Sequence, residues 1–185
     1  MLSIGVRSNG WRTPLVNWTK TVYNAVMNEQ TGYSVLVQTL LEQFGERVKM
    51  IALFGSRSRG EAHPDSDHDI FVVIEDLPQD PLARQREVMA PLLPQLLHLP
   101  ERLSLIAKTP DELASELTPL VVDVCMDGIC LYGQPYFDDL RSKVTQALDA
   151  AGLQRRRLAG TWMWMFPSLP KKEWAVTWEG YREYI

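Results

Sequence analysis

The sequence predicts a mixed α/β protein in which a β-sheet is flanked by helices. Apolar residues recur at helical spacing between Tyr33 and Phe44, and short runs rich in β-branched and aromatic residues then alternate with further helical segments. The length of 185 residues suits one domain, alone or with an appendage, and the 45% of hydrophobic residues is typical of a globular protein.

The predicted core begins with a helix and two strands. Helical spacing of apolar residues from Tyr33 to Phe44 predicts the helix, and Gly45 is a suitable stop signal. The run "RVKMIALFG" predicts a buried strand bounded by glycine. The run "DIFVVIED" predicts a second strand, because β-branched and aromatic residues dominate it.

The middle of the chain alternates in the same way. Residues 81–99 predict a helix that Pro91 and Pro94 break or kink. "RLSLIAKT" predicts the third strand. Thr109 then suits an N-cap, with Pro110 at the first helical position and Glu112 two residues later, so a helix is expected from there.

Beyond Pro119 the pattern leaves one alternative open. "LVVDVCM" either continues the preceding helix or forms a strand, and "GICLYG" predicts another strand. An amphipathic helix is expected over residues 137–151, and "TWMWMF" is expected to be a strand with Trp162 and Trp164 on one face. We therefore expect an N-terminal tail or peripheral helix (1–32), a core (33–133) and a C-terminal helix with a Trp-rich segment packed on that core (134–185).

Composition and charge exclude several classes. A net charge of −4 and a pI near 5.4 argue against a general nucleic-acid-binding protein. Cys125 and Cys130 match neither a disulfide framework nor a CxxC metal site, so buried thiols are expected. We see no signal peptide and no apolar run near the roughly 18 residues of a membrane span, so the expected location is the cytoplasm and no membrane partner is expected.

The stretch "LFGSRSRGEAHPDSDHDIFVVI" carries most of the polar chemistry. It has the glycine spacing of a P-loop, but Glu61 stands where that motif needs lysine and Ala62 where it needs Ser or Thr. An EF-hand starting in "DSDHD" would need glycine where Ile70 stands. His63 and His68 lack a third ligand nearby, and both are interpreted as loop histidines.

A different site remains after these exclusions. Asp67 and Asp69 point to the same side of an extended strand, since alternate side chains share a face. Two carboxylates on one face suit a hard cation such as Mg²⁺ that keeps substrate phosphates in its shell. The backbone amides of Gly55 and Ser56 suit phosphate oxygens at a helix start. Arg57 and Arg59 add positive charge, and together these are the parts of phosphoryl or nucleotidyl transfer.

The stretch resembles the polymerase β-like nucleotidyltransferase superfamily, and most closely its minimal nucleotidyltransferase type. Gly-Ser-Arg-x-Arg-Gly at residues 55–60 and Ser-Asp-x-Asp at residues 66–69 carry the resemblance. It is strong over residues 33–75 and continues more weakly to "GICLYG". The resemblance implies a nucleotidyltransferase core fold with a mixed β-sheet flanked by helices.

The resemblance also implies roles for individual residues. Gly55 and Ser56 would hold the triphosphate of an NTP, with ATP favoured as donor, and Asp67 and Asp69 would bind one or two Mg²⁺ ions. The expected reaction moves a nucleoside monophosphate to a hydroxyl of a small molecule or a protein and releases pyrophosphate.

One position departs from the family pattern. Active members carry a third carboxylate on a later strand, and the position that we assign to it is Ser104. Glu101 is three residues away and would lie on the opposite face of a strand, whereas Asp123 could supply the carboxylate as a catalytic base. Two readings stay open: an active transferase that uses Asp123, or a catalytically inactive nucleotide-binding or antitoxin-like partner-binding protein. A helical partner protein could also complete the acceptor site.

Overall fold

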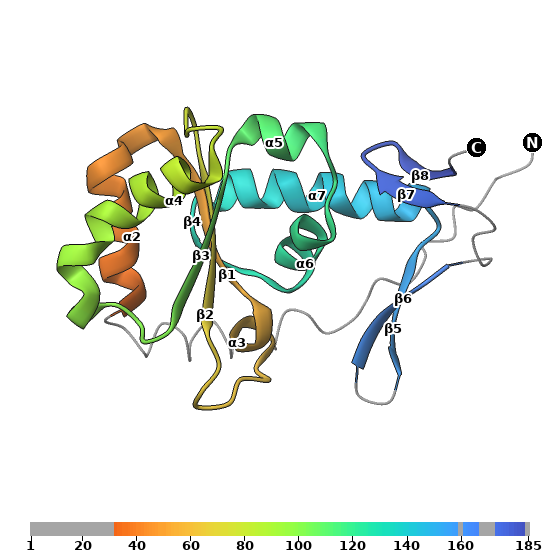
Figure 1. Cartoon of the computed structure of the whole chain (residues 1–185). Coiled ribbons are helices and arrows are strands. Elements are labelled where there is room, and N and C mark those ends of the chain that lie inside the picture. Colours follow the sequence, from red (N-terminus) through yellow and green to blue (C-terminus); the bar gives the residue numbers. More distant parts are fainter. Residues whose placement is uncertain (1–31, 159–160, 167–172, 184–185) are drawn as a thin grey trace, which may run out of the picture.

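The computed structural model describes residues 32–158, 161–166 and 173–183 (Figure 1). Within these residues, four strands form the main sheet, in the order β3-β2-β1-β4. The strands of this sheet are β1 (Val48–Phe54), β2 (His68–Ile74), β3 (Leu103–Lys108) and β4 (Ile129–Tyr132). The predicted mixed α/β fold class is confirmed.

The sheet is mixed because of how its strands are connected. β1 pairs antiparallel with both β2 and β4, whereas β2 pairs parallel with β3. A parallel neighbour needs a crossover connection, and this one contains α4 (Pro81–Met89) and the 3₁₀ helix η2 (Ala90–His98). The short link between β1 and β2 instead contains α3 (Gly55–Arg59) and a loop.

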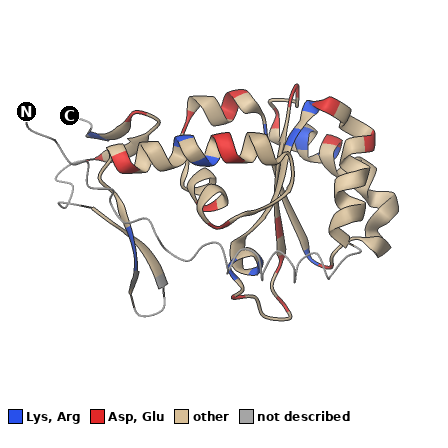
Figure 2. Ribbon diagram, turned by 180° about the vertical axis from the view of Figure 1, so that it is seen from behind, with Lys and Arg blue, Asp and Glu red and all other residues tan. Residues whose placement is uncertain are grey.

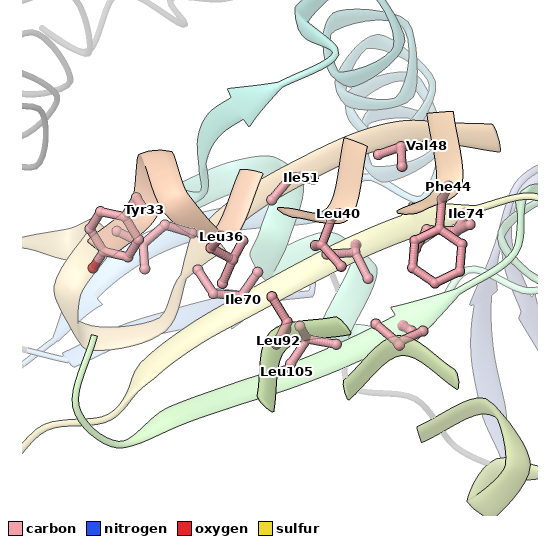
Figure 3. Close-up of a cluster of buried hydrophobic side chains, with 14 of the residues drawn as sticks. Tyr33, Leu36, Leu40, Phe44, Val48, Ile51, Ile70, Ile74, Leu92 and Leu105 are labelled. Atoms are coloured by element: carbon pink, nitrogen blue, oxygen red, sulfur yellow. The ribbon is translucent and has the colours of Figure 1, made fainter. Parts of the chain in front are cut away.

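One face of the sheet packs against α2 (Gly32–Phe44), α4 and η2. Leu36 and Leu40 of α2 and Ile70 of β2 are fully buried (Figure 3). Val72 of β2 is fully buried in the same cluster. Removing such aliphatic side chains from water stabilises the fold by roughly 1.5–3 kcal/mol each. α2 ends at Phe44, where Gly45 takes a positive φ of 54° and opens the short 3₁₀ helix η1 (Gly45–Arg47).

The opposite face packs against three helices from the second half of the chain. These helices are α5 (Pro110–Ser115), α6 (Pro119–Asp127) and α7 (Gln134–Ala150). Phe71 and Val73 of β2 point into this second core, together with Val124 of α6 and Phe137 of α7. The sheet is therefore covered on both faces, and only the ends of its strands are left for a site.

Two hairpins follow α7. They consist of β5 (Gln154–Leu158) with β6 (Thr161–Met165), and β7 (Trp174–Thr177) with β8 (Gly180–Glu183). Arg155 of β5 makes a bidentate ion pair with Asp127 at the end of α6, with N–O distances of 2.6 and 2.5 Å. Its guanidinium lies 4.8 Å from the ring centre of Trp162 and 5.7 Å from that of Trp164, so the first hairpin is tied to α6.

Most predicted elements are confirmed, with four differences. The helix expected over 81–99 ends at Met89, and the segment with Pro91 and Pro94 is 3₁₀. The open alternative after Pro119 is a separate helix, with Thr118 as its N-cap. The C-terminal helix begins at Gln134, three residues before the expected start at Phe137, and the strands β5, β7 and β8 were not predicted.

Other expectations have no such test. The predicted tail lies outside the described residues except for Gly32, and the division into tail, core and C-terminal segment remains a prediction. Within the described part of the chain, no helix combines the length and the apolar character needed to cross a membrane.

Candidate functional site

The Gly-Ser turn and the two aspartates meet at one end of the sheet. α3 begins directly after β1, and Phe54, the last residue of β1, pairs with Asp69 of β2. Gly55 adopts a φ of 77°, which L side chains rarely adopt, and a Cβ on it would overlap Asp69 Oδ2 and lie 3.2 Å from Asp69 Cγ. Only glycine allows the chain to turn this close to the carboxylate.

Successive side chains of β2 point to opposite faces of the sheet, so Asp69 and His68 lie on different sides. Asp69 shares its face with Phe71 and Val73, which belong to the core under α5, α6 and α7. His68 points to the opposite face, where it is buried and its Nδ1 lies 2.5 Å from the hydroxyl of Tyr33. The expectation of a loop histidine is wrong for His68, because it begins β2 and contacts α2.

The parallel pairing of β2 and β3 places Ser104 beside Asp69. The two residues are register partners, so their side chains leave the sheet on the same face. The position that the sequence suggested for a third carboxylate is therefore adjacent to Asp69, and it holds a hydroxyl group. Glu101 precedes β3 and is exposed.

The loop before Asp67 is fixed by side chains. Arg57 of α3 donates two hydrogen bonds to the carbonyl oxygen of Ser66, from Nη2 at 2.7 Å and from Nε at 3.2 Å. The amide of Ser66 donates to the His63 carbonyl, and the His63 amide donates to Ser66 Oγ. Asp67 follows directly, is exposed, and immediately precedes β2.

A second arginine approaches the same loop from β3. Arg102, just before β3, donates to the Asp65 carbonyl oxygen at 2.7 Å and pairs with the Asp65 carboxylate at 3.2 Å. Its own carbonyl accepts from the amide of His68. Sequence reasoning missed Arg102 and also Tyr33, because neither lies in a motif and their partners are 35 or more residues distant.

Arg59 and Asp123 lie at the α3–α6 side of the site. Arg59 Nε donates to Glu61 at 2.9 Å. Asp123 lies on α6 and is exposed overall, yet partial burial of its carboxyl group and the nearby Asp127 raise its pKa, against the opposing effects of Arg155 and Arg59. Figure 2 shows basic residues on α3 close to acidic residues at the start of β2.

The donor set fits a hard cation with few protein ligands. Over the described ranges, no group of three His, Cys, Asp or Glu residues is arranged to hold a metal ion, so Asp123 does not complete such a group with Asp67 and Asp69. Mg²⁺ is commonly bound through one or two carboxylates plus substrate phosphates. The pair Asp67 and Asp69, with the Gly55 backbone against Asp69, matches that requirement.

Several known structures are similar to part of this chain. A toxin–antitoxin complex with AMP-PNP is 29% identical, covering 62% of this chain and 85% of that one, with a TM-score of 0.45. A complex of a tri-AMPylated HEPN toxin from Shewanella oneidensis with an MNT antitoxin is 23% identical, covering 63% and 83%, with a TM-score of 0.44. A search of curated proteins gave no match.

The family assignment rests on a comparison with family models. The model for the nucleotidyltransferase domain matches residues 34–139, more than half of the chain. This span begins in α2 and ends in α7, and it includes the whole Gly55–Asp69 site and Ser104. The glycine turn beside Asp69 lies within this matched span. The chain therefore belongs to the nucleotidyltransferase domain family.

Proposed function

We propose that the protein is a Mg²⁺-dependent nucleotidyltransferase that moves a nucleoside monophosphate from an NTP, with ATP favoured, to a hydroxyl of a small molecule or a protein. The observation that carries this proposal is the contact between the Gly55 backbone and the Asp69 carboxylate. This contact supports the proposal because it puts the turn that we expect to bind phosphate next to a side chain that we expect to bind the cation, within the span that matches the family.

Each matched residue has a distinct task in this proposal. Asp67 and Asp69 hold the cation, which when bound neutralises phosphate charge and favours departure of pyrophosphate. The amides of Gly55 and Ser56 receive phosphate oxygens, and Arg57 and Arg59 contribute positive charge around them. The acceptor oxygen attacks the α-phosphorus, and the bond from that phosphorus to the bridging oxygen of pyrophosphate breaks.

The acceptor proton needs a base, and Asp123 is our candidate. Its raised pKa makes its carboxylate a better proton acceptor than an ordinary aspartate. It lies on α6, which packs on the face of the sheet that Asp69 and Ser104 share.

A second candidate function is a nucleotide-binding or antitoxin-like partner-binding protein without turnover. The observation in its favour is Ser104, whose neutral hydroxyl replaces a carboxylate directly beside Asp69. A nucleotide-binding protein of this kind would still bind Mg²⁺ and nucleotide but would transfer the nucleotide slowly or not at all. A helical partner that completes the acceptor site would make activity depend on that partner.

Thermal unfolding with each of the four NTPs, with and without Mg²⁺, tests the shared part of both functions. A nucleotide at 100 times its dissociation constant stabilises the fold by about 2.7 kcal/mol. We expect one nucleotide, ATP first, to raise the unfolding temperature only with Mg²⁺, and Asp67→Asn with Asp69→Asn to abolish the effect. No shift with any nucleotide would contradict the transferase and the nucleotide-binding protein, and would leave partner binding as the remaining function.

Pyrophosphate release then separates the two functions. It should occur with an acceptor present and disappear in Asp123→Asn if the first proposal is right. Binding without pyrophosphate release, in the presence of a co-purified partner or a screened hydroxyl acceptor, would favour the second.

A further inference from the structure

Arg57 and Arg59 stand two residues apart on α3, yet their side chains have different partners. Arg57 is partly buried and gives two hydrogen bonds to one backbone carbonyl, that of Ser66. Arg59 pairs with the carboxylate of Glu61, at the surface. The two side chains therefore carry the same charge, but Arg57 binds the protein backbone whereas Arg59 binds a surface carboxylate.

The Ser66 carbonyl is a specific target. It belongs to the planar peptide unit that joins Ser66 to Asp67, so holding its oxygen also fixes the orientation of the Asp67 amide. Two donors from one planar guanidinium restrain the direction of that carbonyl better than a single donor would. The loop lies between α3 and β2 and has no strand pairing of its own.

We infer that Arg57 is a positioning residue that holds the Asp67 loop in its cation-binding arrangement before any nucleotide arrives. This inference rests on the proposed function, because it assigns to Asp67 and Asp69 a bound divalent cation. It differs from the role in phosphate binding that the sequence suggested for Arg57, since the guanidinium acts here on the protein backbone.

The two roles predict opposite effects on cation affinity without nucleotide. If Arg57 contributes only positive charge, its removal weakens repulsion and a divalent cation binds more tightly. If it orients the loop, its removal weakens binding, and loss of such a supporting contact typically lowers metal affinity roughly 10–100-fold. Arg59→Ala removes the same charge from the same helix, so it is the matched control.

The experiment is a titration of the nucleotide-free protein with Mn²⁺, followed by the electron paramagnetic resonance signal of the free ion. We expect Arg57→Ala to weaken Mn²⁺ binding about tenfold and Arg59→Ala to leave it unchanged or tighten it. Arg57→Lys keeps the charge but lacks the two-donor fork, and it should weaken binding less than Arg57→Ala. This lysine variant also provides the comparison if Arg57→Ala fails to fold.

Amide hydrogen exchange over residues 63–68, a segment that excludes the Arg59 partner Glu61, gives a second readout in the absence of metal and nucleotide. Exchange should accelerate in Arg57→Ala and stay at the wild-type rate in Arg59→Ala. Tighter Mn²⁺ binding in Arg57→Ala, or unchanged exchange, would overturn the inference and leave the proposed function intact. If the wild type binds Mn²⁺ no better than Asp69→Asn does, the metal site fails and the inference fails with it.

Discussion

Replacing Gly55 by alanine perturbs the site through a single methyl group. Gly55 has a φ of 77°, and the new Cβ would overlap Asp69 Oδ2. The carboxylate or the α3 turn must therefore move. Gly45 offers a matched control, because it has a positive φ of 54° at the end of α2 and a Cβ there would meet no atom within 4 Å.

The two substitutions share one cost and differ in another. An alanine in the left-handed region costs roughly 1–2 kcal/mol at either position. At Gly55 the displaced carboxylate adds roughly 1–3 kcal/mol, the range for inserting a methyl group into a packed site. We expect Gly45→Ala to lower the free energy of unfolding by about 1.5 kcal/mol and Gly55→Ala to lower it by about 3 kcal/mol.

Urea unfolding of the two variants and the wild type, with and without Mg²⁺ and ATP, measures both effects. Gly45 precedes β1 whereas Gly55 follows it, so the two glycines lie at opposite ends of that strand. Gly45→Ala should therefore keep the full stabilisation by nucleotide, about 2.7 kcal/mol at 100 times the dissociation constant. Gly55→Ala should lose most of it, because Asp69 no longer stands where the cation needs it.

The reasoning is refuted if Gly55→Ala is as stable as Gly45→Ala and is still stabilised by Mg²⁺ and ATP. That result would mean that Asp69 moves aside without cost and that its contact with the Gly55 backbone has no part in nucleotide binding. Loss of stability without loss of nucleotide binding would assign the contact to folding alone.

Three further predictions concern single side chains. Ser104→Asp should raise pyrophosphate release at least about tenfold, as a well-placed general base does, whereas Ser104→Asn should not. Asp127→Ala leaves the largely buried Arg155 side chain without its partner and should lower the free energy of unfolding by about 3 kcal/mol in urea titrations. Asp139→Ala, in an exposed pair, should change it by less than about 0.5 kcal/mol. Because the pKa of Asp123 is raised in the folded protein, its ionisation lowers the free energy of unfolding once the pH exceeds the Asp123 pKa of the unfolded chain. Asp123→Asn should therefore unfold at a higher urea concentration than wild type near pH 7. The difference should vanish below about pH 3, where the carboxyl group is protonated in both states.

Much of the fold follows from local sequence because its elements carry strong local signals. The capping box of Thr109 and Glu112 is present as expected, with the Thr109 hydroxyl accepting from the Glu112 amide. "LVVDVCM" could not be assigned, since β-branched residues suit both states and a buried helix shows no clean period. The Thr118 cap and Pro119 at the first turn decide for the helix.

The site was predictable only where it is local. The Gly-Ser turn and the aspartates lie within fifteen residues, and the spacing of Gly55 from Asp69 could be read directly. The contacts of Arg102 and Tyr33 depend on which strands pair and which helix covers them, and sequence alone does not give that information. The register that sets Ser104 beside Asp69 agrees with the position assigned to it from the family pattern.

The tie between Asp127 and Arg155 sets an order of events during synthesis. The family-matched segment ends at residue 139, so the ribosome releases it before Arg155 is available. Until then, Asp127 has no guanidinium to compensate its charge, and the aromatic face of the hairpin is missing from the second core. Domains generally fold as their chains emerge, but here the family-matched segment needs the C-terminal hairpin before α6 reaches its final stability.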